Sequence, residues 1–490
     1  MTRRLPGPRL AALALAAALG GCVSLAPEYK RPPLPVADSY PPLPGEAAAA
    51  PPAAAASDAT PSAAADIAWQ QFFGDPQLRE LIDAALQNNR DLRVAVLNIE
   101  QARASYQIQR ADQLPNVNLG IVGNRLTNAD GSITSSYVAG LSLASFELDF
   151  FGRVKSLSDA ALAMYLASEE ARRTAQITLV AAVANAYYTL LADTEALALA
   201  KRTSATREDS LRLTRLKFDN GVASELDVAQ AQSLVEGARV AQAALRRMIA
   251  QDVNALVLLV GKPVKLDVAP DVEIIGTRVG PDLPAGLPSE LLAQRPDIRQ
   301  AEQQLRAANA NIGAARAAFF PRITLTGSAG SASGDLLGLF DSGTLAWSFT
   351  GQLLQPIFDA GRNQANLDAA KAAREIGVAQ YEKSIQTAFR EVADALAARA
   401  TLGEQLRAQQ AQERADAQRF QLADLRYRSG VTSFLDVLDA QRALFTTQLA
   451  TVQVQLTKLQ NEVTLYKVLG GGWTEPAARN TASQPGADPG

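Results

Sequence analysis

The chain has 490 residues, with 47 Lys+Arg against 50 Asp+Glu, one cysteine and no histidine. The formal net charge of −3 gives no basic face for nucleic acid, so we expect no nucleic-acid partner. The lack of histidine removes the commonest general base and metal ligand, and one cysteine excludes an intramolecular disulfide. No nucleophile elbow, metal-ligand cluster or phosphate-binding glycine loop occurs in the sequence. We therefore expect no enzyme, no metal and no soluble cofactor.

Residues 1–21 have the pattern of a signal peptide. A basic start, Met1-Thr2-Arg3-Arg4, precedes an apolar run from Leu10 to Leu19, which is too short to span a bilayer core of about 30 Å. Small residues then lead to Cys22, and Leu19-Gly20-Gly21-Cys22 resembles a bacterial lipobox. The resemblance implies that Cys22 carries covalent lipid and becomes the mature N-terminus. The alternative is a chance cysteine near a cleavage site.

Two features predict where the mature chain lies. Two or three acyl chains on Cys22 would anchor it stably to a membrane. Val23 differs from the aspartate that the lipoprotein-sorting resemblance associates with inner-membrane retention, which favours the outer membrane. Beyond the signal peptide we find no run of 18 apolar residues, so any spanning segment must be a β-structure.

The mature chain is an internal duplication. Residues 218–228 recur at 427–437, where Gly430 takes the place of Gly221. This period of about 200 residues is far above that of a solenoid. We predict a lipidated segment and Ala/Pro-rich linker over 22–75, with the richest part at 47–65. Two repeats follow, 76–280 and 281–473, each with a helix, two strands and a long helical hairpin, and then a disordered tail over 474–490.

Long proline-free stretches carry helical patterns in both repeats. Apolar residues spaced alternately by three and four indicate coiled coils; the clearest set is Leu449, Val452, Leu456, Leu459, Val463 and Tyr466. If Arg153 to Phe218 formed one continuous helix, its 66 residues would extend about 100 Å. Gly221 and Gly430 then stand where helices end and the chain reverses. Taken alone, this periodicity would also suit a cytosolic coiled-coil rod.

Four segments alternate at period two and predict strands. They lie at about 115–127, 135–150, 321–333 and 343–357, and turn-forming residues separate the two members of each pair. Alternating segments of about ten residues are typical of a transmembrane barrel. Four strands cannot close a barrel wide enough to conduct, so several chains must pool their strands. Oligomerisation is therefore a prediction of the strand count.

Several ordered motifs resemble one known family. They are Pro27-Glu28-Tyr29-Lys30-Arg31-Pro32, Asp149-Phe150-Phe151-Gly152-Arg153, Ala293-Gln294-Arg295-Pro296-Asp297-Ile298, Asp359-Ala360-Gly361-Arg362, Tyr427-Arg428-Ser429-Gly430 and Leu465-Tyr466-Lys467-Val468-Leu469-Gly470. These motifs, which run through nearly the whole mature chain, are similar to the outer-membrane factors of tripartite RND-type efflux systems, TolC/OprM-like and of the NodT-type lipoprotein branch.

The resemblance implies a membrane α+β fold. Three chains would form a homotrimer with a twelve-strand outer-membrane β-barrel, four strands per chain, continued by a long periplasmic α-helical coiled-coil barrel. The implied function is a passive export duct, opened at its periplasmic tip by a periplasmic adaptor (membrane fusion) protein and an inner-membrane RND-type transporter, to expel drugs or other toxic compounds. Outer-membrane lipid is a further partner. The alternative is a periplasmic coiled-coil scaffold lipoprotein without channel activity.

The resemblance also implies a periplasmic gate. Leu435 matches a hydrophobic constriction, and Asp436 and Asp439 match acidic rings that face the axis. Arg442 lies three residues after Asp439 on the same helix, which allows an ion pair between them. The alternative is that these acids are solvated surface residues or helix N-cap partners.

Gly221 and Gly430 are implied to form the hairpin tips. Tyr427 and Asp227 match a pair that holds the closed tip together. Thr432 stands where some family members carry an arginine that locks neighbouring chains, so we expect that lock to be missing or replaced.

Overall fold

The computed structural model describes residues 24–41, 64–266, 268–269, 274, 279–280, 283 and 294–473. The expected signal peptide, Cys22, most of the linker and the tail lie outside these residues. The described elements in chain order are η1 (Ala64–Asp66), α2 (Trp69–Phe72), α3 (Pro76–Asn88), α4 (Arg90–Ala111), β1 (Val117–Thr127), β2 (Ile133–Leu148), α5 (Arg153–Asp219), α6 (Glu225–Val260), α8 (Pro296–Ala317), β3 (Arg322–Ser333), β4 (Leu345–Leu354), α9 (Arg362–Arg428) and α10 (Phe434–Val468).

Two compact units divide the chain, and neither is one of the two sequence repeats. The first combines residues up to 34 with 96–171 and 297–384; the second combines 35–95 with 172–296 and the chain from 385 onward. Each unit therefore takes matching pieces from both halves of the duplication. The repeat boundaries describe the sequence, whereas the compact units are built by pairing equivalent pieces of the repeats.

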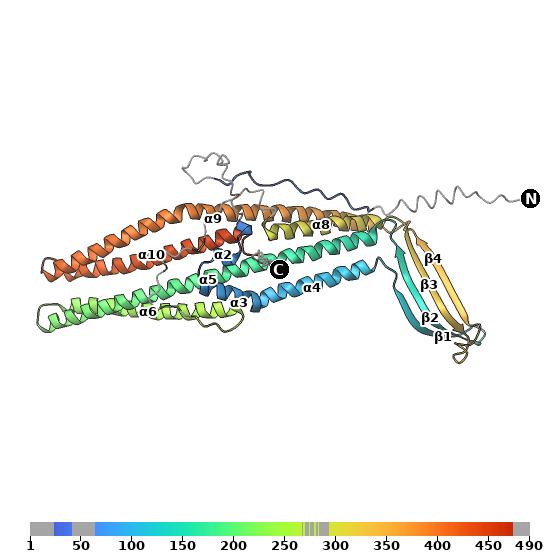
Figure 1. The fold of residues 1–490 in the computed structure, drawn as a ribbon, viewed down its shortest axis with the longest axis horizontal. Coiled ribbons are helices and arrows are strands. Elements are labelled where there is room, and N and C mark those ends of the chain that lie inside the picture. The colour runs from blue at the N-terminus through green and yellow to red at the C-terminus, as the bar shows by residue number, and fades with distance from the viewer. Residues whose placement is uncertain are drawn as a thin grey trace, which may run out of the picture. The chain divides into compact units, whose positions relative to one another are not determined.

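The first unit contains a four-stranded antiparallel sheet in the order β1-β2-β3-β4 (Figure 1). One face is polar: Asn118, Ser142, Ser328 and Ser348 form a row across all four strands. The neighbouring row on the other face is Leu119, Leu141, Ala329 and Trp347, and Leu119 and Trp347 are 81% and 76% exposed. Polar and apolar side chains alternate in this way along strands that lie between water and lipid. Among the described residues, β1 and β4 each keep one edge unpaired.

A β-bulge keeps this division intact near the base of the sheet. The register between β2 and β3 shifts between Leu143 and Phe146, and Ser145 adopts a positive φ of 48°. The extra residue returns Phe146 to the apolar face and turns Glu147 to the polar face. Glu147 there binds Arg322 at 2.6 Å and Arg153 at 2.7 Å, which ties the two middle strands to the start of α5.

Two helices of 67 residues, α5 and α9, form long hairpins with α6 and α10 (Figure 1). The condition considered for Arg153 to Phe218 is met, since α5 is one continuous helix that runs to Asp219. Among the described residues, α5 alone is long and apolar enough to cross a membrane, but 67% of its most apolar window is buried inside the molecule. Its apolar residues therefore serve helix packing.

An aromatic cluster holds the α2 segment against the end of α10 in the second unit. The rings of Phe72 and Tyr466 stack with centroids 3.9 Å apart, and Phe73 meets Phe72 edge-on. The hydroxyl of Tyr466 donates a hydrogen bond to the carbonyl of Ile67. All three rings are at most 2% exposed. Burial of such large rings makes this cluster a main source of stability for the unit.

Candidate functional site: the hairpin tips

The tip of the first hairpin is closed by a Schellman motif. Gly221 has a φ of 74°. Its N–H donates to the carbonyl of Phe218, and the N–H of Val222 donates to Lys217, both at 2.8 Å. These bonds satisfy carbonyls that the end of a helix leaves without partners. Glycine is favoured because a side chain at positive φ is strained. The expected role of Gly221 as a helix-ending residue is confirmed.

The following helix, α6, begins with a reciprocal capping box. The backbone N–H of Asp227 donates to Ser224 Oγ at 3.2 Å, and the backbone N–H and hydroxyl of Ser224 donate to Asp227 Oδ2 at 2.9 and 2.7 Å. The box satisfies two N–H groups and places a carboxylate at the positive end of the helix. The sequence signal for it is Ser-x-x-Asp, at residues 224–227.

The second tip repeats the turn but lacks the closed box. Gly430, at a φ of 75°, donates to Tyr427, and Val431 donates to Arg426, at 3.0 and 2.9 Å. This is the same Schellman motif, so the expectation for Gly430 is also confirmed. However, Ser433 at the start of α10 makes no side-chain capping hydrogen bond.

Asp436 is the residue of the second repeat that corresponds to Asp227. Its carboxylate accepts a hydrogen bond from the hydroxyl of Thr432 and does not close a box with Ser433. Thr432 thus has a partner within its own chain, at the position where we expect the lock between neighbouring chains to be missing or replaced. The same four-residue pattern therefore has two different hydrogen-bond arrangements in the two repeats.

The other expected gate residues lie on the same helix. Leu435 is 50% exposed, which is ordinary for a single leucine on a protein surface. Arg442 Nη1 lies 3.6 Å from Asp439 Oδ1, so the ion pair that their spacing allowed is present. Both side chains are about half exposed, and the contribution of such a pair to stability is below about 1 kcal/mol. The pair can therefore rearrange at little cost.

The expected latch pair is not joined by a hydrogen bond in the part of the chain that the structure describes. Asp227 is engaged in its capping box with Ser224. Tyr427 instead packs its ring against Phe434, with centroids 5.2 Å apart, and the Nζ of Lys217 lies 4.1 Å from the centre of the same ring. This cation–π contact joins the end of α5 to the end of α9.

Apolar side chains from all four helices pack together just behind the tips. The buried members are Leu211, Ala231, Leu234, Val235, Phe434, Val437 and Leu438, with Val228, Phe420, Ala423 and Tyr427 packed against them. This cluster, which we call the tip core, holds the two hairpins against each other within one chain. Any separation of the hairpins at the tip has to expose it.

A buried arginine beside the tip core is a residue that sequence reasoning missed. Arg207 is 5% exposed. Its Nη1 donates to the carbonyl of Leu234 at 2.9 Å, and its guanidinium lies 5.2 Å from the ring centre of Phe445. Burial, followed by the nearby charge of Arg442, lowers the pKa of Arg207. Nothing in the sequence distinguishes it from the many arginines that face solvent on these helices.

The N-terminal segment is fixed along α8 in the first unit. Asn309 Nδ2 donates to the carbonyl of Pro27 at 2.7 Å, and Arg316 Nη1 donates to that of Leu25 at 3.1 Å. Gly313 allows this approach, because a Cβ there would lie 2.8 Å from the backbone nitrogen of Ala26. The chain that follows the expected lipid-bearing Cys22 is thus held at the end of α8 next to the sheet.

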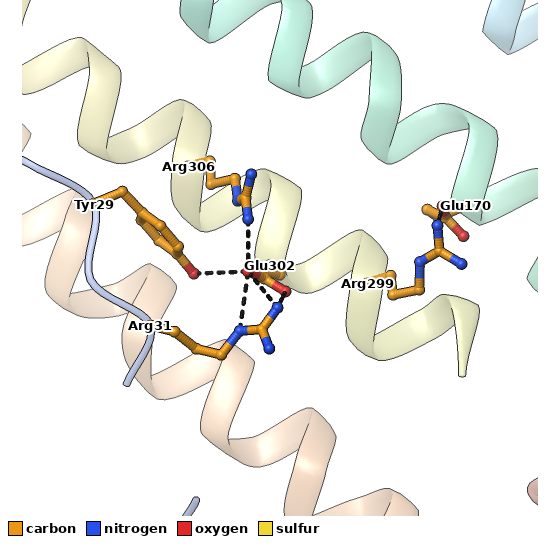
Figure 2. A network of polar contacts seen from close by, with 6 residues as sticks. All are labelled: Tyr29, Arg31, Glu170, Arg299, Glu302 and Arg306. Atoms are coloured by element: carbon orange, nitrogen blue, oxygen red, sulfur yellow. Dashed lines mark hydrogen bonds and ion pairs between the residues drawn. The ribbon is translucent and has the colours of Figure 1, made fainter. Parts of the chain in front are cut away.

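Figure 2 shows the polar network that secures this segment, centred on the buried Glu302. Its carboxylate accepts from Arg31 at 2.8 Å, from Arg306 at 3.0 Å and from the hydroxyl of Tyr29 at 3.2 Å. Burial opposes ionisation, but the hydrogen bonds from both arginines outweigh it and lower the pKa of Glu302. Burial and the same carboxylate raise the pKa of Tyr29 to about 12. Arg299 adds an ion pair with Glu170 of α5 at 2.7 Å (Figure 2).

A four-stranded sheet with one exposed apolar face, joined to long helical hairpins, is typical of one class of outer-membrane channel. The chain matches the family model for outer membrane efflux proteins over residues 81–262 and 287–471. It is similar to the toluene efflux pump outer membrane protein TtgC and the antibiotic efflux pump outer membrane protein ArpC, both of Pseudomonas putida. Each is 49% identical over 464 residues, which cover 93% of this chain and 94% of the relative.

A solved structure agrees with these relatives. The open state of the Neisseria gonorrhoeae MtrE outer membrane channel superposes with a TM-score of 0.82 at 41% identity, covering 92% of this chain and 99% of that one. The chain therefore belongs to the outer membrane efflux protein family. It is an outer-membrane export duct of an efflux pump, and its relatives are channels rather than enzymes. The scaffold alternative, a lipoprotein without channel activity, receives no support from them.

Proposed function

We propose that three copies of this chain form a duct that completes a tripartite pump with a periplasmic adaptor and an inner-membrane RND-type transporter. The observation that supports this best is the sheet, which has one apolar and one polar face and whose two edges are both unpaired in the part of the chain that the structure describes. An open membrane sheet would leave backbone N–H and C=O groups unsatisfied in lipid, which only closure prevents. Pooling four strands from each of three chains gives twelve, enough for a conducting lumen.

The cargo follows from the nature of a passive conduit. Relatives of this chain are named for toluene and for antibiotic efflux. We propose that this duct passes the same broad class, apolar toxic compounds and drugs, with selection made by the transporter. The lipid on Cys22 is proposed as a second attachment to the outer membrane. The docked segment that starts at Ser24, held by Arg316 and the Glu302 network, supports it by fixing the chain next to the sheet.

We propose that the gate is the set Leu435, Asp436, Asp439 and Arg442 at the start of α10. In a trimer the two acids would place six carboxylates around the axis and favour cations. The weak Asp439–Arg442 pair and the uncapped start of α10 support a tip that can change shape. Tyr427 and Asp227 are proposed as a latch between the hairpins that forms in the assembled, closed duct.

Single-channel conductance of the purified, lipidated protein in a planar bilayer tests the duct and its gate. We expect small, cation-selective openings from the wild type. Asp436→Ala with Asp439→Ala should weaken the cation preference, because it removes the proposed carboxylate ring. Confirmed trimeric insertion with no conductance, even when adaptor is added, would contradict the proposed duct. Unchanged ion selectivity in the double variant would remove these acids from the gate.

The latch requires a control for the capping box. Asp227→Ala removes both the proposed latch partner and the box with Ser224, whereas Ser224→Ala removes the box alone. Tyr427→Phe removes the hydroxyl and keeps the ring that contacts Lys217. Larger openings in Tyr427→Phe and Asp227→Ala, but not in Ser224→Ala, would support the latch. If Asp227→Ala and Ser224→Ala gave equally enlarged openings, the effect would be due to the loss of helix capping.

A further inference from the structure

The connection between β3 and β4, residues 334–344, is unlike the other connection at the same end of the sheet. The turn between β1 and β2 is polar: Asn128 Nδ2 donates to Ser132 Oγ and the N–H of Ser132 donates to Asp130, both at 2.9 Å. The β3–β4 connection instead exposes Leu336, Leu337 and Phe340, by 55%, 92% and 77%. We call these three side chains the loop patch.

The hydrogen bonds of Ser331 show on which face of the sheet this loop lies. Ser331 pairs with Ala139 and Leu345, so its side chain belongs to the apolar face. Its hydroxyl donates to the carbonyl of Leu339, and it also contacts the hydroxyl of Thr344. The loop is therefore folded over the apolar face, where Leu339 is 1% exposed.

The loop patch continues the surface that faces lipid. Leu345, Trp347 and Phe349 carry the apolar face along β4 and are 83%, 76% and 64% exposed. The patch lies immediately before Leu345 in the chain and on the same side of the sheet. The helices α4, α5, α8 and α9 join the strands at the other end of the sheet, so with the helices in the periplasm this end of the sheet is the outer one.

We propose that the loop patch inserts at the boundary between headgroups and acyl chains of the outer leaflet and acts as a shallow membrane contact at the rim of the barrel. If the loop lay in water, three large apolar side chains would be exposed together, which is rare in the loops of soluble proteins. Asp335 and Asp341 border the patch and are exposed. These carboxylates need water, so the insertion reaches only the boundary between headgroups and acyl chains.

Fluorescence quenching in reconstituted bilayers tests this contact. Leu337→Cys in the full-length protein is labelled with bimane and placed in phosphatidylcholine vesicles brominated near the headgroup end of the acyl chains. Ala129→Cys in the polar β1–β2 turn is the matched control. Because an interfacial group lies about 5–10 Å below the headgroups, we expect brominated lipid to quench the label at 337 about twofold more than at 129. Aqueous iodide should show the opposite order.

Two outcomes would overturn the proposal. Equal quenching by iodide at both sites would show that the loop patch is in water. Protection from both quenchers at 337 would show that a second copy of the chain covers it. Leu336→Cys provides a second labelling site if Leu337→Cys does not insert, and channel conductance of each labelled protein establishes that it is folded. Loss of the lipid contact would leave the proposed duct itself unaffected.

Discussion

At the scale of single residues, the carboxyl groups of Asp193 on α5 and Asp252 on α6 form a close pair. Asp193 is 9% exposed, and one oxygen of Asp193 and one of Asp252 are buried without a hydrogen-bond partner in the described structure. Burial, followed by the charge of Asp193, raises the pKa of Asp252 to about 6. Burial also raises the pKa of Asp193. The two groups are expected to share a proton below about pH 6.

The stability of the hairpin should therefore depend on pH. Between the ordinary pKa of 3.8 and about 6, the folded state holds a proton that the unfolded state has lost. Stability then falls as pH rises through this window. Asp252→Asn should remove the fall and stabilise the protein at pH 7.5 by about 1 kcal/mol, a value reduced for partial solvent screening.

Thermal unfolding followed by circular dichroism at pH 4, 5.5 and 7.5 measures this effect. Asp209→Asn is the matched control, because Asp209 lies on α5, the helix of Asp193, and its side chain is 68% exposed. We expect the control to behave as the wild type at each pH. A parallel pH profile for Asp252→Asn and the wild type would show that the pair does not hold a proton.

At the scale of elements, the two hairpins start their return helices differently. Ser224 caps α6 through its box with Asp227, whereas Ser433 contributes no capping bond to α10. Ser224→Ala should cost about 1 kcal/mol of local stability, and Ser433→Ala much less. Hydrogen exchange of the amides in the first turn of each helix gives the local free energy. Equal losses at the two tips would mean that the second box closes in solution.

Much of this architecture could be predicted from patterns with a regular period. The strands lie within a few residues of the expected segments, and α5 ends next to Gly221 as its turn requires. Periodicity fails where partners are far apart in the chain. The bonds from Arg31 to Glu302 and from Arg207 to Leu234 depend on packing between elements. The capping box between Ser224 and Asp227 is local, and the Ser-x-x-Asp pattern is enough to predict it.

At the scale of the whole molecule, both edges of the sheet need partners. β1 and β4 are separated by two strands, so residues on them lie about 14 Å apart within one chain at a spacing of about 4.8 Å. A disulfide requires Cα atoms within about 7 Å. A bond between cysteines on β1 and β4 can therefore form only between chains, if β1 of one copy pairs with β4 of the next.

We expect Val122→Cys on β1 to form such a bond with a cysteine at one of three β4 positions. The three positions are Ala346, Ser348 and Thr350, which lie on the polar face of the sheet, as Val122 does. Mild oxidation should convert the correctly registered double variant into covalent trimers on denaturing gels, because each chain would be bonded to both neighbours. Ser142→Cys, on the interior strand β2, is the matched control and should stay monomeric with the same β4 cysteines. Monomers from all three Val122 pairs, in protein that conducts, would contradict closure of the barrel by neighbouring β1 and β4 strands.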